Sequence, residues 1–459
     1  MSDTLAERLL AALPESAEPA AVEARRHFLA AGLPTPKVES WRYSSLRGLQ
    51  ALDPAAGHAP AVVPPELAGL SGTLATLTAG GWTLSPDAPA GLSLSVGATS
   101  RRDQAPVGAT SRRDQAPVGA TSRRDQAPAG ATSRRDLLAE GNENGKCDDG
   151  GRDARSLLPT ANTAADAFRL LNQAGATECL TLDVAGTVNG IWRLALQHDA
   201  LGLSQSRLQL NLCENASITL MEHWFGADEA GGLSNVLLDV DLQAGAQLTL
   251  IRLQETGAKA QSVQQTRIRC AAGAQVSLVV LELGGLWSRH DLQLQLAAAG
   301  AIVNVHGLVA LQGRQHHDSQ LALTHAAGAA QSKTLWKAIA NARSRSVFDG
   351  LITVAPGADQ TEAHLKTANL LLSAHAEIDT KPELVIEADE VVCSHGATVG
   401  QLDDKVLFYL RSRGIPMALA RQMLTLAFGG EVLSAVADET LRAALAERVA
   451  VHLPQGAVD

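Results

Sequence analysis

The sequence predicts a mainly β protein in which a β-solenoid core lies between helical segments near the two ends of the chain. Between about residues 157 and 400, apolar and polar residues alternate with a period of two, as at Leu208, Leu210 and Leu212, which is typical of half-buried strands. No long helical pattern separates these strands, so a fold of alternating strands and helices is not expected. Gly-Ala pairs recur every 27 to 29 residues, which indicates stacked coils.

The recurring pairs are expected to form tight corners between strands. Glycine and asparagine adopt a positive φ more readily than other residues, and Asn215-Ala216 stands 30 residues before the first pair. One coil buries little apolar surface by itself, so neighbouring coils must complete the core. Chance recurrence is the alternative, because the chain has 40 glycines. The pairs begin at Gly245, Gly273, Gly300, Gly328 and Gly357.

The segments on either side of the predicted solenoid have a helical texture. Near the start, Thr35 is a good N-cap and Pro36 suits the first position of a helix, so a helix is expected there. After about residue 401, Gly414 is a natural helix stop and Pro416 opens a second helix. The predicted organisation is a helical N-terminal domain and connector at 1–95, a repeat insertion at 96–155, a β-helix core at 156–400 and a helical C-terminal domain at 401–459.

A tandem repeat interrupts the chain before the solenoid. The sequence Val-Gly-Ala-Thr-Ser-Arg-Arg-Asp-Gln-Ala-Pro occurs three times without change over 96–128, and an incomplete copy spans 129–136. Each copy offers only Val and Ala as apolar residues, so we expect a disordered insertion rather than a packed unit. A tolerated surface loop is the simpler interpretation, and a basic arm for an acidic partner is the alternative.

Composition excludes several functional classes. The formal net charge of −10 and the pI of about 5.7 argue against a nucleic-acid binder, and aromatic residues make up only 3%. The chain lacks an apolar run of membrane-spanning length and a signal-peptide pattern at its start, so no membrane association is expected. The five cysteines include no Cys-x-x-Cys pair, which fits a reduced, cytoplasmic location.

The chemistry visible in the sequence is sparse. Residues 141–146 (GNENGK) are one residue too short for a phosphate loop, so no ATP site is expected. His316-His317-Asp318 could bind a metal, but hydrogen-bonded side chains are the preferred interpretation, because neighbouring strand residues face opposite sides. Cys393 and His395 would share one face of a strand, and their side chains suit iron or zinc. Two ligands are too few for a closed site, so a second subunit would have to complete it; a buried cysteine and a core histidine remain the alternative.

Several segments together resemble the SufB/SufD family of the SUF iron–sulfur cluster assembly system, and its SufD members in particular. These segments include Ser346-Val-Phe-Asp-Gly350, Ala376-Glu-Ile-Asp-Thr-Lys-Pro382, Cys393-Ser-His-Gly-Ala-Thr-Val-Gly-Gln-Leu-Asp403 and Leu407-Phe-Tyr-Leu-Arg-Ser-Arg-Gly-Ile415. The resemblance is most specific over 346–430. A SufB-type chain would carry acidic residues on both sides of His395 and a cysteine near Ile386, and this chain has neither.

The resemblance implies a right-handed parallel β-helix and a scaffold role without enzyme activity. It implies pairing with the paralogue SufB, docking of the ATPase SufC through the C-terminal helices, and transient binding of iron or a nascent cluster by His395, with Cys393 as a further ligand, at the SufB–SufD interface. We expect the docking residues to be Leu407, Phe408, Tyr409, Arg411 and Arg413. The alternatives are a SufB-type scaffold and a carbohydrate-active β-helix protein; a homodimer in isolation is also conceivable.

Overall fold

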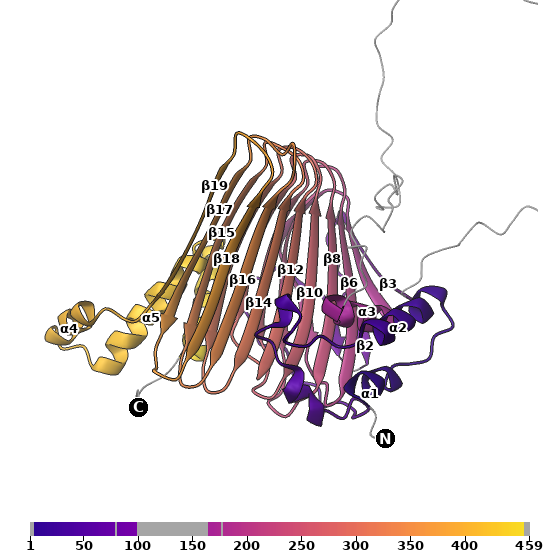
Figure 1. Cartoon of the computed structure of the whole chain (residues 1–459), viewed down its shortest axis with the longest axis horizontal. Helices are drawn as coiled ribbons and strands as arrows, with labels where there is room; N and C mark the ends of the chain where they lie inside the picture. Colours follow the sequence, from indigo (N-terminus) through magenta and orange to yellow (C-terminus); the bar gives the residue numbers. More distant parts are fainter. Residues whose placement is uncertain (1–3, 79, 99–163, 176–177, 454–459) are drawn as a thin grey trace, which may run out of the picture.

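The computed structural model describes residues 4–78, 80–98, 164–175 and 178–453. Two sheets face each other along a parallel β-solenoid of about eight turns, and successive strands alternate between the sheets (Figure 1). All neighbouring strands are parallel except the pairs β1–β2 and β3–β4. The fold class predicted from the sequence is therefore confirmed.

The order of strands in each sheet follows the order of the coils. The ten-stranded sheet runs β19 (Val392–Gly400), β17 (Glu362–Leu371), β15 (Gln331–Ala340), β13 (Ile302–Leu311), β11 (Gln275–Glu282), β9 (Gln247–Glu255), β7 (Ser217–Phe225), β5 (Thr187–Gln197), β1 (Gly72–Thr78), β2 (Gly81–Leu84). The nine-stranded sheet runs β18 (Glu377–Ile386), β16 (Arg345–Val354), β14 (His316–His325), β12 (Trp287–Leu296), β10 (Gln261–Cys270), β8 (Leu233–Leu242), β6 (Leu203–Leu212), β4 (Glu178–Val184), β3 (Leu92–Ala98). Each coil thus adds one strand to each sheet.

The corners of the coils lie where the Gly-Ala pairs predict them, with one shift. Asn215 and four of the five glycines have a positive φ, for example 67° at Gly245 and 77° at Gly357. At Gly328 the prediction is wrong by one residue, because Ala329 takes the positive φ of 54°. The alanine that follows each corner is buried against the neighbouring coil, and there Ala330 takes that role.

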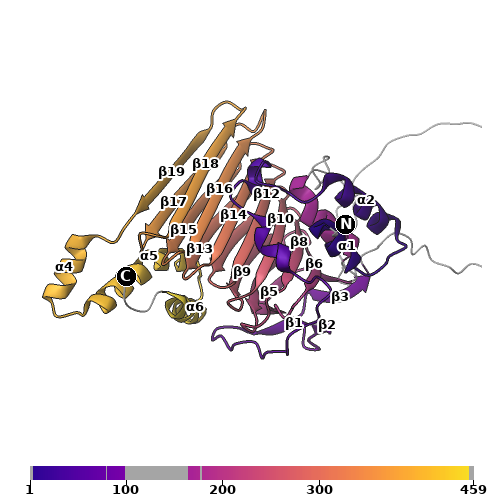
Figure 2. The same ribbon diagram turned by 60° about the horizontal axis from the view of Figure 1, so that its bottom comes forward.

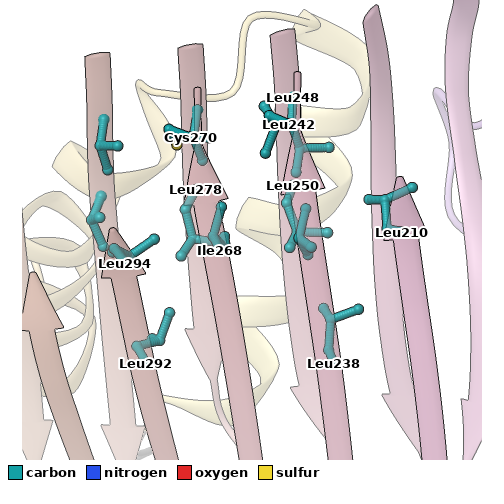
Figure 3. Packing of buried hydrophobic residues seen from close by; sticks show 14 of the residues in the cluster. Leu210, Leu238, Leu242, Leu248, Leu250, Ile268, Cys270, Leu278, Leu292 and Leu294 are labelled. Atoms are coloured by element: carbon teal, nitrogen blue, oxygen red, sulfur yellow. The ribbon is translucent and has the colours of Figure 1, made fainter. Parts of the chain in front are cut away.

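The inward faces of the two sheets form one continuous apolar core. Residues at the same position in successive coils stack in ladders, as Ile268 and Leu294 do on β10 and β12 (Figure 3). Leu250 and Leu278 make the matching ladder on β9 and β11. Burial of one such leucine is worth about 1.5–3 kcal/mol, so the solenoid is held mainly by contacts between coils.

The N-terminal helices pack on the outer face of the nine-stranded sheet. Helices α1 (Leu5–Ala11), α2 (Pro19–Ala31) and α3 (Ala167–Gly175) bury Phe28 and Phe168 against the sheet residues Leu233 and Val263. The helix predicted from Thr35 is wrong: Val38 closes a turn with Thr35, and only the 3-10 helices η1 (Glu39–Trp41) and η2 (Leu46–Ala51) follow. Contacts of Trp41 with the sheet override the local capping signal.

The C-terminal helices are arranged differently from one another. Helices α5 (Met417–Leu433) and α6 (Glu439–His452) pack on the outer face of the ten-stranded sheet, where Val432 and Leu445 join Ile251 and Leu281 in an apolar cluster. Helix α4 (Asp404–Ser412) stands away from both sheets beyond the last coil (Figure 2). Within the described ranges, no helix is both long and apolar enough to cross a membrane.

The repeat insertion begins inside a strand. It was expected from residue 96, but Val96 and Gly97 belong to β3, which pairs with β4. The first repeat copy therefore contributes to the sheet. The remainder of the predicted insertion, residues 99–155, lies outside the residues that the structure describes.

Candidate functional site

The last coil leaves one end of the solenoid open. Strands β18 and β19 each lie at the edge of their sheet and pair on one side only, with β16 and β17. The other end is extended by β1, β2 and β3, which include the antiparallel pairings. The backbone groups of two parallel edge strands are thus free at the open end, which is the arrangement that can pair with another chain.

Side chains that would be buried in any earlier coil are exposed at this open end. Leu365, which is 2% exposed, is the register partner of His395, and the buried Ala363 is the partner of Cys393. Cys393 is half-buried and packs against the core cluster, whereas His395 is exposed. The two residues therefore follow the inward-facing ladders, as the strand pattern predicted, but no further coil in the described part of the chain covers them.

Cys393 and His395 are two potential ligands and do not make a closed metal site. Among the described residues, no group of three or more His, Cys, Asp or Glu side chains is arranged to hold a metal ion. Burial raises the pKa of the Cys393 thiol, so the protonated form is favoured. His395 forms no hydrogen bond or ion pair with any described residue, which leaves its ring nitrogens available to a ligand.

The neighbours of the pair are polar. The hydroxyl groups of Thr367 and Thr380 lie 3.0 Å apart across the two sheets, and the Asn369 amide donates to the Thr398 carbonyl at 3.0 Å. Ser394 points to the opposite side of β19 and contacts the His364 ring nitrogen Nδ1 at 2.7 Å. The open end therefore combines apolar side chains, such as the half-buried Leu384 and the exposed Val399, with polar groups near His395.

Helix α4 presents the other set of predicted residues. Phe408 and Tyr409 are 73% and 56% exposed, and Arg413 lies over the Tyr409 ring at 5.3 Å. Arg411 is also exposed. Leu407 is only 5% exposed, so its side chain offers little surface to a partner. The exposed aromatic residues leave an apolar face on a helix that is far from the sheets (Figure 1).

On β14, His317 is hydrogen-bonded, as preferred from the sequence, whereas the buried Nε2 of His316 has no hydrogen-bond partner among the described residues. His317 lies 2.5 Å from Ser288 and 2.9 Å from Ser319, and Asp318 accepts from Arg289 at 2.7 Å. Sequence reasoning missed that Arg289 also donates to the Ser40 carbonyl at 2.7 Å. The only signal was an arginine two residues before an aspartate on a predicted strand, which is too common to be specific.

Residues 195–428 match the family described as SUF system FeS cluster assembly, SufBD core domain. This chain belongs to the SufB/SufD family. The match covers most of the solenoid, the open end with Cys393 and His395, helix α4 and part of α5. It leaves out the N-terminal helices and the repeat insertion, so the family assignment rests on the part of the chain that carries the candidate site.

Individual relatives agree with this assignment, and one of them is a SufD protein. The iron-sulfur cluster assembly protein SufD of Escherichia coli is 36% identical over 251 residues, which cover 55% of this chain and 59% of that protein. An iron-sulfur cluster assembly SufBD family protein of Synechocystis is 35% identical over 256 residues, covering 53% of this chain and 56% of the relative. The chain thus matches between half and two thirds of the length of these relatives.

Proposed function

We propose that this chain is a non-enzymatic scaffold subunit for iron–sulfur cluster assembly. The observation that carries the proposal is the open end of the solenoid, where Cys393 and His395 face outward from two edge strands without completing a metal site. The family match over this region and the similarity to the iron-sulfur cluster assembly protein SufD of Escherichia coli support it. An incomplete ligand set at a surface able to extend a sheet is useful only if a second subunit supplies the missing ligands.

The proposed second subunit is the paralogue SufB, which would place its own edge strands against β18 and β19. Val392 is 60% exposed, and Val385 and Ile386 are 44% and 43% exposed, so association would bury apolar surface as well as pair backbone groups. When SufB is absent, a second copy of this chain would cover the same surface. Sedimentation of the chain with and without SufB tests this: the homodimer should give way to a heterodimer. If the homodimer persisted at saturating SufB, the homodimer and the heterodimer would use different surfaces of this chain, which would contradict the proposal.

In this proposal, iron or a nascent cluster is the cargo, and His395 supplies one nitrogen ligand or handles a proton during its entry. The His395→Ala variant should fold and assemble normally, because an exposed ring contributes little to a large interface. It should form clusters at a strongly reduced rate in the reconstituted complex, measured anaerobically as iron and sulfide content. Cys393→Ser should be milder, because the pKa of the thiol is raised and the side chain packs on the core.

The pair of variants makes the experiment decisive. Normal cluster formation by His395→Ala would make His395 structural. A greater defect in Cys393→Ser would assign the ligand to the cysteine instead. His375→Ala is a suitable control, because His375 is also an exposed histidine but lies in the turn before β18.

The ATPase SufC is the proposed partner of α4. Phe408 and Tyr409 would anchor it, with Arg411 and Arg413 at the rim. Removing everything after Asp403 would be a poor test, because α5 and α6 cover the apolar outer face of the ten-stranded sheet. We therefore expect the surface substitution Phe408→Glu combined with Tyr409→Glu to abolish co-purification with SufC and to leave the melting temperature unchanged. Retention of SufC would place its site elsewhere.

A further inference from the structure

A pocket of about 470 Å³ lies on the outer face of the ten-stranded sheet, away from the interior-facing residues of the open end. Strands β13, β15 and β17 form its floor, and helix α5 borders it through Glu431. Its lining includes four basic or imidazole side chains and one aliphatic residue. The lining residues are His306, Lys333, Thr334, Leu335, His364, Lys366 and Glu431.

The strand register places these side chains in a compact grid. His306, Leu335 and Lys366 are register partners across the three strands. Lys333 and His364 are partners in the adjacent row. Neighbouring strands lie about 4.8 Å apart and alternate residues about 6.6 Å apart, so flexible lysine side chains from both rows can converge on one small ligand.

Between β7 and β17, basic and imidazole side chains occupy these two rows only from β13 onward. On β7, β9 and β11, the row of Lys333 holds uncharged hydroxyl residues, and the row of Lys366 holds apolar residues. The residues concerned are Thr219, Thr249 and Ser277 in the first row and Met221, Ile251 and Val279 in the second. The second row there belongs to the apolar cluster beneath the C-terminal helices. The sequence thus changes to histidine and lysine where this helical cover ends.

The positive charge of the pocket is balanced only in part, because Lys366 helps to lower the pKa of Glu431 without forming an ion pair with it. Neither Lys333 nor Lys366 forms an ion pair with another described residue. Glu431 is bound to the ammonium group of Lys337, a buried side chain that also donates to the Phe428 carbonyl at 2.8 Å. Glu362 lies on the same face but one step further along β17, beside Gln331.

One nitrogen in the pocket also lacks a partner. The Nδ1 atom of His306 is buried and has no hydrogen-bond partner among the described residues. A buried polar atom left unpaired costs about 1–3 kcal/mol, so such an atom at a pocket wall calls for a ligand or a water.

We propose that this pocket binds a phosphoryl group. Two lysine ammonium groups supply point charges, and the rings of His306 and His364 supply directional hydrogen bonds to its oxygens. Half-buried Leu335 lies between them and provides an apolar contact for the organic part of a phosphorylated compound. The ligand is therefore either inorganic phosphate or a small phosphorylated metabolite, and both share the same anionic group.

The test is a calorimetric titration of the full chain with inorganic phosphate and, separately, with adenosine monophosphate, at constant ionic strength. We expect saturable binding at one site, with a dissociation constant of about 1 mM or below. The double variant Lys333→Gln and Lys366→Gln should weaken binding at least tenfold. The matched control is Lys259→Gln with Lys405→Gln, which removes two exposed lysines elsewhere and should leave binding unchanged.

The Leu335→Ser variant distinguishes the two sources of the phosphoryl group. Weaker binding of adenosine monophosphate alone would identify a phosphorylated metabolite, and unchanged binding of both probes would identify inorganic phosphate. The proposal is overturned if neither probe binds saturably to the wild-type chain. It is equally overturned if the control pair loses as much affinity as the pocket pair, because the binding is then a general effect of net charge.

Discussion

Replacing Arg289 by methionine should detach an N-terminal strap, residues 39–45, from the outer face of the nine-stranded sheet. The guanidinium group of Arg289 is only 2% exposed and pairs with Asp291 and Asp318, each at 2.7 Å. It also donates to the Ser40 carbonyl and lies over the Trp41 ring at 4.0 Å. One side chain therefore joins two buried carboxylates to the strap.

The expected loss follows from the charges left behind. Methionine fills a similar volume but leaves Asp318, which is fully buried, without its ionic partner. Removing one member of a buried ion pair costs about 3–5 kcal/mol. At about 2 °C per kcal/mol for a large domain, the melting temperature should fall by about 6–10 °C. Adding Asp318→Asn should recover part of the loss, because it removes the uncompensated charge.

Calorimetry and limited trypsin digestion measure the two consequences. Arg42 and Arg47 are exposed trypsin sites in or beside the strap, and cleavage there should accelerate in Arg289→Met. The control is Arg269→Met on β10, whose pair with Asp241 at 3.5 Å is partly exposed and worth about 1 kcal/mol or less. If Arg289→Met melted within about 1 °C of this control and were cut no faster, the ion pairs would not hold the strap.

Three further predictions address the core, the effect of pH and the repeat. Burial lowers the pKa of His198, His290 and His325 to about 4, so these histidines bind protons in the unfolded chain before they do so in the folded one, and stability should decline as the pH falls from about 6.5 towards 4. Unfolding at pH 5 should take up roughly one proton for each of these histidines, which calorimetry in buffers of different ionisation enthalpy measures. Inside the solenoid, Glu282→Gln should lower the free energy of unfolding in urea by about 3 kcal/mol or more, because the charged Glu282 accepts from Arg252 at 2.7 Å. Glu222→Gln should cost less, because burial raises the pKa of Glu222, and equal losses would contradict the inference that Glu282 is the main charged partner of Arg252. Deleting residues 99–131 keeps Val-Gly-Ala on β3 and should shift the melting temperature by less than about 2 °C, whereas a larger fall would mean that the repeat stabilises the fold.

The solenoid could be predicted because its signals are local. A corner such as Gly245-Ala246 requires a positive φ at the first residue and a small buried side chain at the second, and both needs are visible in the sequence. The shift at Gly328-Ala329-Ala330 could not be predicted, because glycine and alanine both fit that turn once the neighbouring coil fixes it. The alternation of strand residues also placed Cys393 and His395 on one face.

Features that depend on contacts between distant segments were not predictable. Trp41 lies next to a good helix-capping sequence, and its contact with Arg289, nearly 250 residues later, explains why no α-helix forms there. The basic pocket depends on Lys333 and His364 becoming neighbours, which needs the register between coils and not merely their spacing. Basic residues spaced about one coil apart in the sequence, such as Lys333 and His364, are the signal that could have suggested the pocket.

The strap imposes an order on the folding of the chain. It reaches across consecutive strands of the nine-stranded sheet, from Arg289 on β12 to Lys381 on the last strand, where Glu39 pairs with Lys381 at 3.0 Å across 342 residues of sequence. At about 5–20 residues per second, a ribosome needs about 20–70 s to make the intervening chain. The strap can therefore contact Arg289 only after β12 has been made, and its last contact, Glu39 with Lys381, forms only when the final coil is in place.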